Sequence, residues 1–461
     1  MKEILIVSLL GIAILAADIL KLRKLIFPIS IIGLLGLIAS CVIDWGHNEI
    51  PFAENGGMLL FDNFALAFTL VLAVIALFWF VLTRDSFSSN SGQTDIYALI
   101  LFSLCGAVIM VSYTNVILLF LGIEILSIPL YVLAASDRKN ILSNEAGFKY
   151  FFLGSFASAI LLFGLALVYG ATGSFDIYVI AEKAAQLGSA SSLLVVGSLL
   201  IFIGFAFKVS VAPFHLWAPD VYQGSPTVIT AFMATIVKAA AFGGMYRIFS
   251  GPLYSFIEDF NVLIAILSGL TLILANAIAT RQQNSKRLLA YSSISHAGFM
   301  MGGIMMCGSF PAKYLLYYIL TYSLASLTAF AIFQKVSAKQ NGLEEIDAFK
   351  GLVRRNPLMA SAMTIALFSM AGIPPMSGFM AKYFVISEVL SGGYLWLVII
   401  MILSSVVAMY YYLKLIIAMF SPIENAGRMV ISTTQKTFYI LLSALMILLF
   451  FGAAFLEVIA W

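Results

Sequence analysis

Residues 120–135 read FLGIEILSIPLYVLAA, an apolar run with a single carboxylate, Glu124, inside it. The run has the composition of a membrane-spanning helix, which needs about 20 mostly apolar residues. A charged side chain at the centre of a bilayer costs about 3 kcal/mol or more to insert. We therefore expect Glu124 to have a function that offsets this cost.

The composition of the whole chain agrees with a membrane location. The chain has 461 residues, of which 62% are hydrophobic and 10% are charged, and its mean hydropathy is +1.05. Soluble domains contain about 45–50% apolar and about 25% charged residues. The composition predicts an all-α polytopic membrane protein with almost no extramembrane domain, and we expect it to bind no nucleic acid.

Hydropathy predicts about 14 transmembrane helices. The first, Ile4 to Leu20, has no A-x-A cleavage site and is predicted to be a retained span, not a signal peptide. The predicted spans begin near Ile4, Ile26, Phe64, Ile96, Val116, Phe148, Leu193, Val228, Val262, Leu288, Leu315, Met359, Leu395 and Phe438.

Two predicted spans, the seventh and the twelfth, are longer than one straight crossing needs. The seventh contains KVSVAPFHLWAPD (residues 208–220) and the twelfth contains AGIPPMSGFMAK (residues 371–382), each with prolines midway. Proline removes a backbone donor and interrupts a helix, and paired interruptions in the two halves of a chain are typical of transport sites. We expect discontinuous helices 7 and 12, either as transport elements or as structural kinks.

Positive charge is distributed unequally between alternate loops. One set of loops carries only Lys2, Lys183, Arg247 and Lys313, and four more lysines lie within spans. The remaining seventeen of the 25 lysines and arginines fall in the opposite set of loops. By the positive-inside rule, both termini are predicted to be non-cytoplasmic.

The four lysines within spans are Lys208, Lys238, Lys382 and Lys414. The first three are too deep to extend easily to the membrane surface, whereas Lys414 is close enough to a span end to do so. Among the acidic residues, Asp18, Glu388 and Glu457 are predicted near span ends, and only Glu124 near a centre.

A buried glutamate and lysine can exchange protons when their contact changes. Two unit charges about 4 Å apart interact by roughly 4 kcal/mol at an effective dielectric constant of 20, which is about a thousandfold in proton affinity. Moving one charge against 100 mV requires about 2.3 kcal/mol. A contact between Glu124 and one of the deep lysines is thus strong enough to control proton movement. The alternative is a network of ion pairs that only holds helices together.

The histidines and cysteines give weaker evidence of function than the buried lysines and glutamate. His215 lies beside the first interruption, and His296 is predicted to open the tenth span within a serine-rich turn of Ser292, Ser293 and Ser295. Both are candidate proton relays or simple structural donors. Cys41, Cys105 and Cys307 are too far apart in sequence for a metal site or disulfide framework, and no metal site is expected.

Four segments together resemble one family. LGIEILSIPLYVLAA (121–135), VSVAPFHLWAPDVYQGSPT (209–227), NSKRLLAYSSISHAGF (284–299) and AGIPPMSGFMAKYFVI (371–386) are similar to the antiporter-like subunits of respiratory complex I. The resemblance covers nearly the whole chain. Lysine at position 382 is similar to one branch of this family, whereas a second branch has glutamate there. Because the sequence ends at Trp461, soon after the fourteenth predicted span, we expect it to lack the long lateral helix that marks a third branch.

The resemblance implies a fold of two inverted five-helix repeats. It divides a single membrane domain, residues 1–461, into helices 1–3 (1–92), a first repeat of helices 4–8 (93–250), a second repeat of helices 9–13 (251–422) and helix 14 (423–461). It places the proton-translocating residues at Glu124, Lys208, Lys238 and Lys382. We expect Glu124 to pair with Lys208, whose proton would pass through water and Lys238, past His296, to Lys382. His296 and His215 are possible relays, and the second repeat has no carboxylate matching Glu124.

The resemblance also implies a function and partners. Proton pumping would be coupled to NADH oxidation and quinone reduction in other subunits, which would hold NAD, FMN, Fe–S clusters and quinone, with no cofactor in this chain. The expected partners are the neighbouring antiporter-like subunit M, small membrane subunits, the lipid of a bacterial inner membrane, protons and water. The alternatives are a subunit of an Mrp-type cation/proton antiporter and a non-pumping scaffold of a membrane hydrogenase-like complex.

Overall fold

The computed structural model describes residues 1–46, 57–87, 93–188, 191–340, 342–423 and 427–454, and in these the regular elements are helices apart from three isolated bridges. The helices in the first part are α1 (Lys2–Ile19), α2 (Ile26–Ile43), α3 (Asn63–Phe87), α4 (Gln93–Ser112), α5 (Val116–Ala134), α6 (Ile141–Thr172), α7 (Ile177–Leu187), α8 (Ser192–Lys208), α9 (Trp217–Gly224), α10 (Thr227–Phe232) and α11 (Lys238–Phe249). Those in the second are α12 (Tyr254–Ala279), α13 (Ser285–Met305), α14 (Ala312–Lys339), α15 (Leu352–Arg355), α16 (Pro357–Ala371), α17 (Ser377–Ser391), α18 (Leu395–Phe420) and α19 (Thr433–Gly452).

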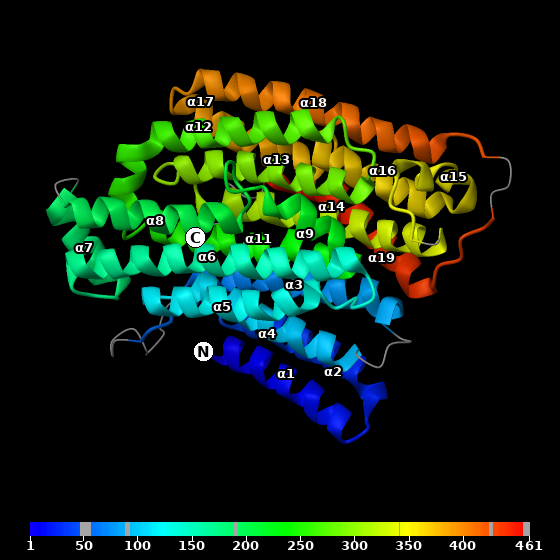
Figure 1. Ribbon diagram of the computed structural model, residues 1–461, viewed down its shortest axis with the longest axis horizontal. Helices are drawn as coiled ribbons and strands as arrows, with labels where there is room; N and C mark the ends of the chain where they lie inside the picture. Colours follow the sequence, from blue (N-terminus) through cyan, green and yellow to red (C-terminus); the bar gives the residue numbers. More distant parts are fainter. Residues whose placement is uncertain (47–56, 88–92, 189–190, 341, 424–426, 455–461) are drawn as a thin grey trace.

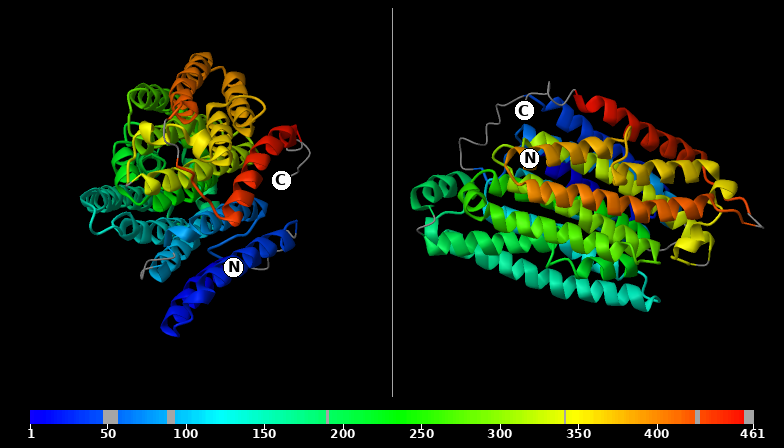
Figure 2. Two further views of the ribbon diagram at one scale, coloured as in Figure 1. Left: turned by 90° about the vertical axis from the view of Figure 1, so that its right-hand side faces the viewer. Right: turned by 90° about the horizontal axis from the view of Figure 1, so that it is seen from above.

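The long helices run side by side along one direction of the molecule (Figure 1). Seen along that direction, α1 and α2 lie at one edge, and α19 crosses back towards α3 (Figure 2). Helix α1 begins and α19 ends at the same end of the bundle (Figure 1).

Ten helices of the described residues are long and apolar enough to cross a membrane. They are 23–43, 63–84, 94–112, 116–134, 141–172, 227–249, 254–279, 312–339, 395–420 and 433–452. An 18-residue window of the segment 227–249 is wholly buried inside the bundle, whereas only 22% of the corresponding window of 433–452 is buried. The prediction of an all-helical membrane protein is confirmed.

The first predicted interruption is present between α8 and α9. The freed backbone groups have side-chain partners: Trp217 Nε1 donates to Phe207 O at 3.0 Å, and Thr271 Oγ1 accepts from Ala212 N at 2.9 Å. Backbone inside a membrane must find such partners within the protein. Pro219 lies in the first turn of α9, where proline is tolerated, and Pro213 lies in the interruption.

The second interruption separates α16 from α17. Gly372 ends α16 with φ +83°, a conformation that glycine adopts without strain. Ser369 Oγ then accepts from Gly378 N at 3.2 Å. Both predicted discontinuities are therefore confirmed as breaks in the helices.

Close packing of small residues fixes α5, which carries Glu124, against α4. A Cβ atom added at Gly106 would overlap the backbone nitrogen of Leu126 and lie 2.7 Å from Gly122 O. Small residues at such crossings let membrane helices approach each other closely. The position of α5 thus depends on the absence of a side chain at residue 106.

Replacing Gly106 with valine is expected to destabilise the protein, because over-packing costs about 1–3 kcal/mol or more where backbone must move. The midpoint of thermal aggregation of the purified chain in detergent should fall by several degrees. Gly36→Val in α2 is the matched control, since a Cβ there meets nothing within 4 Å. Equal midpoints for the two variants would contradict the role of this crossing.

Candidate functional site

Lys208 is the last residue of α8 and is 5% exposed. Its Nζ donates to Ser127 Oγ at 2.7 Å and to Tyr131 OH at 3.4 Å, both on α5. The interruption that follows ends α8 at this lysine, and the lysine side chain joins the end of α8 to α5. The buried ammonium group is therefore held by neutral oxygens and not by a carboxylate.

Glu124 is half-buried on α5, and its Oε1 is buried without a hydrogen-bond partner. Within the described residues, no ion pair joins Glu124 to Lys208, so the predicted contact is not formed in this structure. Ser127 and Tyr131 follow Glu124 by three and seven residues, and this spacing places all three on one face of α5. About one helical turn, which is 5.4 Å along the axis, separates Ser127, which now binds the lysine, from the carboxylate of Glu124.

Lys238 lies near the centre of the bundle and is 3% exposed. It follows a single π-helical segment, Met233–Val237, of a kind often found at functional sites. Its Nζ donates to Ser293 O at 2.6 Å and to Ser293 Oγ at 2.5 Å. Tyr322 OH donates to the same Ser293 Oγ at 2.8 Å, so three helices, α11, α13 and α14, meet at one serine.

His296 lies one turn further along α13 and is 5% exposed. Its Nδ1 shares a hydrogen bond of 2.8 Å with Tyr318 OH, and its ring lies 4.8 Å from the ring of Tyr322. The prediction that His296 opens a span within a serine-rich turn is wrong: α13 is one continuous helix from Ser285, and the histidine is in its middle. The adjacent serines are helical because their hydroxyls find partners inside the bundle.

A small cavity of about 10 Å³ lies between His296 and the second interruption. Its lining includes Tyr318, Tyr322, Ser369 and Gly378. This volume is close to the minimum that holds one water molecule, and its lining has the polar groups that such a water requires. The cavity connects the histidine to the helix break that precedes Lys382.

Lys382 is 6% exposed on α17. Its Nζ donates to Ala371 O at 2.9 Å and to Ser405 Oγ at 3.3 Å, and it lies 5.0 Å from the centre of the Phe299 ring. Ala371 is the last residue of α16, so the ammonium group occupies the negative end of that helix. The interruption thus exposes a carbonyl that binds the lysine.

Within the described part of the chain, the remaining charged residues and histidine singled out from the sequence form no hydrogen bond or ion pair with the three buried lysines. His215 is buried in the first interruption, and its Nδ1 has no partner among the described residues. Lys414 contacts Gln282 O and Gln283 Oε1, each at 3.3 Å, in the loop after α12, which agrees with its predicted place near a span end. Asp18 pairs with Arg23 at 2.6 Å. Glu388 lies two turns after Lys382, near the end of α17, and Glu457 lies outside the described residues.

Sequence reasoning missed the partners of the lysines. Ser127 and Tyr131 could have been found from their spacing to Glu124, but Tyr318, Tyr322 and Ser405 lie on other helices without a local signal. The sequence also did not reveal an ion cluster at the end of the bundle opposite α7. There, Asp220 contacts Lys149 and Arg287, each at 2.7 Å, which ties α6 and α13 to α9.

The buried groups form three units of hydrogen bonds. The first joins α5 and α8 at Lys208, the second joins Lys238 to Tyr322 through Ser293 with His296 and Tyr318 adjacent, and the third holds Lys382. Such chains of titratable and hydroxyl groups can pass protons when water bridges the units. Across the described residues, no three His, Cys, Asp or Glu side chains are grouped so as to hold a metal ion.

Comparison with known proteins gives the family. A family model described as "NADH:quinone oxidoreductase/Mrp antiporter, TM" matches residues 113–408. The NADH-quinone oxidoreductase subunit N of Cytophaga hutchinsonii is 44% identical over 426 residues, which cover 91% of each chain.

Solved structures show the same fold. A chain of respiratory complex I from Thermus thermophilus superposes with a TM-score of 0.84 at 31% identity, covering 99% of this chain and 98% of that one. A chain of the Mrp complex from Dietzia superposes with a TM-score of 0.86, covering 98% and 95%, but at 20% identity this likeness concerns the fold alone.

Proposed function

Because the chain belongs to the NADH:quinone oxidoreductase/Mrp antiporter family, we propose that it is a proton-translocating subunit in the membrane arm of an NADH:quinone oxidoreductase. The proposal rests on the high identity to subunit N over nearly the full length. Oxidoreductase activity then belongs to the assembled complex, of which this chain is one subunit. The redox groups, NAD, FMN, Fe–S clusters and quinone, belong to the other subunits. The neighbours of this chain in the membrane arm are subunit M and small membrane subunits.

We propose fourteen crossings arranged as two inverted repeats. The ten long apolar helices are joined by α1, by α13 and by the two interrupted pairs, α8 with α9 and α16 with α17. An even number of crossings is supported by α1 and α19, because α1 starts and α19 finishes at the same end of the bundle (Figure 1). The repeats would comprise residues 93–250 and 251–422, with the termini on the non-cytoplasmic side of a bacterial inner membrane.

The contact that carries the proposed mechanism is the one between Lys238, Ser293 and Tyr322. A proton leaving Lys208 reaches Lys238 through water, and Ser293 and Tyr322 connect that lysine to the neighbourhood of His296. The small cavity beside the histidine holds one water molecule that passes the proton towards Lys382. His215 binds water at the first interruption, where its Nδ1 has no partner among the described residues.

Movement of the Lys208 side chain along α5 couples the signal from the neighbouring subunit to proton release. In the observed state the lysine contacts Ser127 and Tyr131, and the carboxylate of Glu124 lies one turn away on the same face. A signal from the neighbouring membrane subunit that brings the two charges together would stabilise the charged lysine by roughly 4 kcal/mol at an effective dielectric constant of 20. Separation of the pair then releases the proton.

Glu124→Gln tests the proposed role directly. The amide keeps the shape of the side chain but has no negative charge to stabilise the charged lysine, so NADH-driven proton uptake by inverted membrane vesicles should fall about three- to tenfold. Glu388→Gln on α17, near a span end, is the matched control and should keep at least half the activity. Normal pumping by Glu124→Gln in fully assembled complex would contradict the assignment.

An Mrp-type cation/proton antiporter is the second candidate, because the description of the matching family model names Mrp antiporters beside NADH:quinone oxidoreductase. It predicts sodium-dependent proton exchange in vesicles without NADH. Our proposal predicts no exchange until NADH is supplied, so the same vesicles distinguish the two functions.

A further inference from the structure

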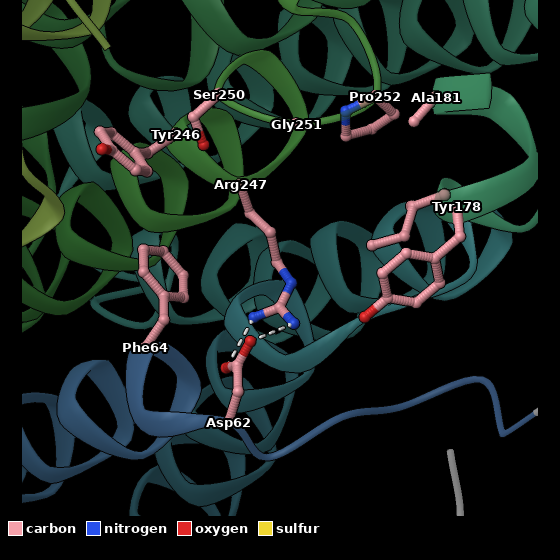
Figure 3. A pocket seen from close by; sticks show the side chains of 10 residues that line it. Asp62, Phe64, Tyr178, Ala181, Tyr246, Arg247, Ser250, Gly251 and Pro252 are labelled. Atoms are coloured by element: carbon pink, nitrogen blue, oxygen red, sulfur yellow. Dashed lines mark hydrogen bonds and ion pairs between the residues drawn. The ribbon is translucent and has the colours of Figure 1, made fainter. Parts of the chain in front are cut away.

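A pocket of about 310 Å³ lies at the end of the bundle where α7 is found, apart from the lysine sites (Figure 3). It is bounded by the start of α3, by α7, and by the end of α11 with the turn that follows. Its lining is Asp62, Phe64, Ile177, Tyr178, Ala181, Tyr246, Arg247, Ser250, Gly251 and Pro252. None of these residues has a role in the function proposed above.

The positively charged group in the lining of this pocket is Arg247, whose side chain is 9% exposed. Its Nη1 donates to Asp62 Oδ1 at 3.1 Å and to Val111 O at 3.0 Å, and its Nη2 donates to Asp62 Oδ2 at 2.9 Å. The Nε atom is buried and has no partner among the described residues. One edge of the guanidinium group is thus bound to Asp62, and the other edge, Nε with the outer hydrogen of Nη2, has no hydrogen-bond partner among the described residues.

The free edge has the geometry of an oxyanion site. Two parallel N–H groups of arginine match two oxygens of a phosphate or carboxylate. Figure 3 shows that this edge faces across the pocket towards the hydroxyl of Tyr178, away from Asp62. The Arg247 edge and the Tyr178 hydroxyl therefore face a space of about 310 Å³, which is large enough for a phosphate with attached carbons.

The walls and the position of the pocket favour a lipid over a free ion. Phe64, Ala181 and Pro252 give it apolar walls, which do not suit a fully hydrated anion. Helix α7 is amphipathic and buries Ile177, Ile180 and Ala184. Its exposed face includes Tyr178, Val179 and Leu187, at 60%, 36% and 37% exposure. A helix of this kind, lying across the end of a membrane bundle (Figure 1), lies at the level of the lipid headgroups.

We propose that this pocket binds the phosphate of a membrane phospholipid, with two phosphate oxygens on the free edge of Arg247 and the Tyr178 hydroxyl as a further donor. Asp62 makes the pair with Arg247 neutral, so the site favours a headgroup that carries its own positive charge. Phosphatidylethanolamine has this chemistry, because its ammonium group can approach the carboxylate while its phosphate binds the arginine.

Native mass spectrometry of the purified full-length chain tests the proposal, with palmitoyl-oleoyl-phosphatidylethanolamine as the probe. Ala181→Phe fills the pocket without touching the Arg247–Asp62 pair, and Arg247→Lys keeps the charge but removes the paired donors. Each should weaken the tightest lipid adduct about tenfold. Ala185→Phe, one turn further along α7 and outside the pocket, is the matched control and should leave the adduct within twofold of the unmodified chain.

The possible outcomes separate the sources of phosphate. Equal adducts in Ala181→Phe and Ala185→Phe would overturn the site. Displacement of the lipid by inorganic phosphate would overturn the assignment to a headgroup in favour of the free ion. Tighter binding of phosphatidylglycerol than of phosphatidylethanolamine would overturn the role given to Asp62. All of these readouts are independent of proton pumping, so failure here leaves the proposed function standing.

Discussion

Lys208→Met is expected to reduce NADH-driven proton pumping by the assembled complex at least tenfold. Methionine has a similar length and fills the same space between α5 and α8, but it cannot carry a proton or approach a carboxylate. It also leaves the hydroxyls of Ser127 and Tyr131 without their present donor. We expect the loss of pumping because, among the described contacts, this lysine is the only charged group that joins α8 to α5. Acidification of inverted vesicles, followed with a pH-sensitive dye on addition of NADH, measures the effect.

The control for this variant is Lys414→Met. That lysine also lies on a membrane helix, but its hydrogen bonds within the described residues are to the loop after α12, at Gln282 and Gln283. It should retain at least half of the pumping. Comparable losses in both variants, with assembly verified by native gel, would mean that any lost lysine damages the complex and that Lys208 has no special role.

Lys238→Met is expected to have a similarly large effect, at least tenfold, because this lysine connects the two halves of the proposed path. Its ammonium group is bound by Ser293, which in turn binds Tyr322. Removing the ammonium leaves the serine and tyrosine joined to each other but isolated from the first unit. The same vesicle assay measures pumping, and quinone reduction measured in parallel shows whether electron transfer has slowed with it.

Lys238→Arg distinguishes proton transfer from simple charge. Arginine keeps the positive charge but does not lose its proton at any physiological pH. If the residue passes protons, Lys238→Arg should be as defective as Lys238→Met. Recovery of more than half of the pumping with arginine would show that the charge alone matters, and the relay through Ser293 would then be wrong.

The predicted span positions were most accurate where apolar sequence begins sharply. The starts predicted at Ile26, Val116 and Leu395 coincide with the starts of α2, α5 and α18. The start predicted at Phe148 is seven residues late, because α6 begins with polar turns that hydropathy does not score as membrane. The amphipathic α7 was not predicted, since it is too short and too polar to resemble a span.

The candidate site was predicted in its residues but not in its contacts. Four deep charges were identified from the cost of burying them, and three of them are lysines with at most 6% exposure. The fourth, Glu124, was expected to hold Lys208, yet the lysine contacts hydroxyls one turn away. Which oxygen a long side chain selects depends on rotamers and on neighbouring helices, and neither is encoded in local spacing.

The burial of the segment 227–249 has a consequence for how the protein is made. An 18-residue window of this segment is wholly buried inside the bundle, yet during synthesis it leaves the ribosome before the later helices that will surround it exist. Until α13 and α14 emerge, the ammonium of Lys238 has no serine or tyrosine to bind. We therefore expect a nascent chain halted after residue 250 to need assistance from the insertion machinery, and its release to depend on the arrival of the second half.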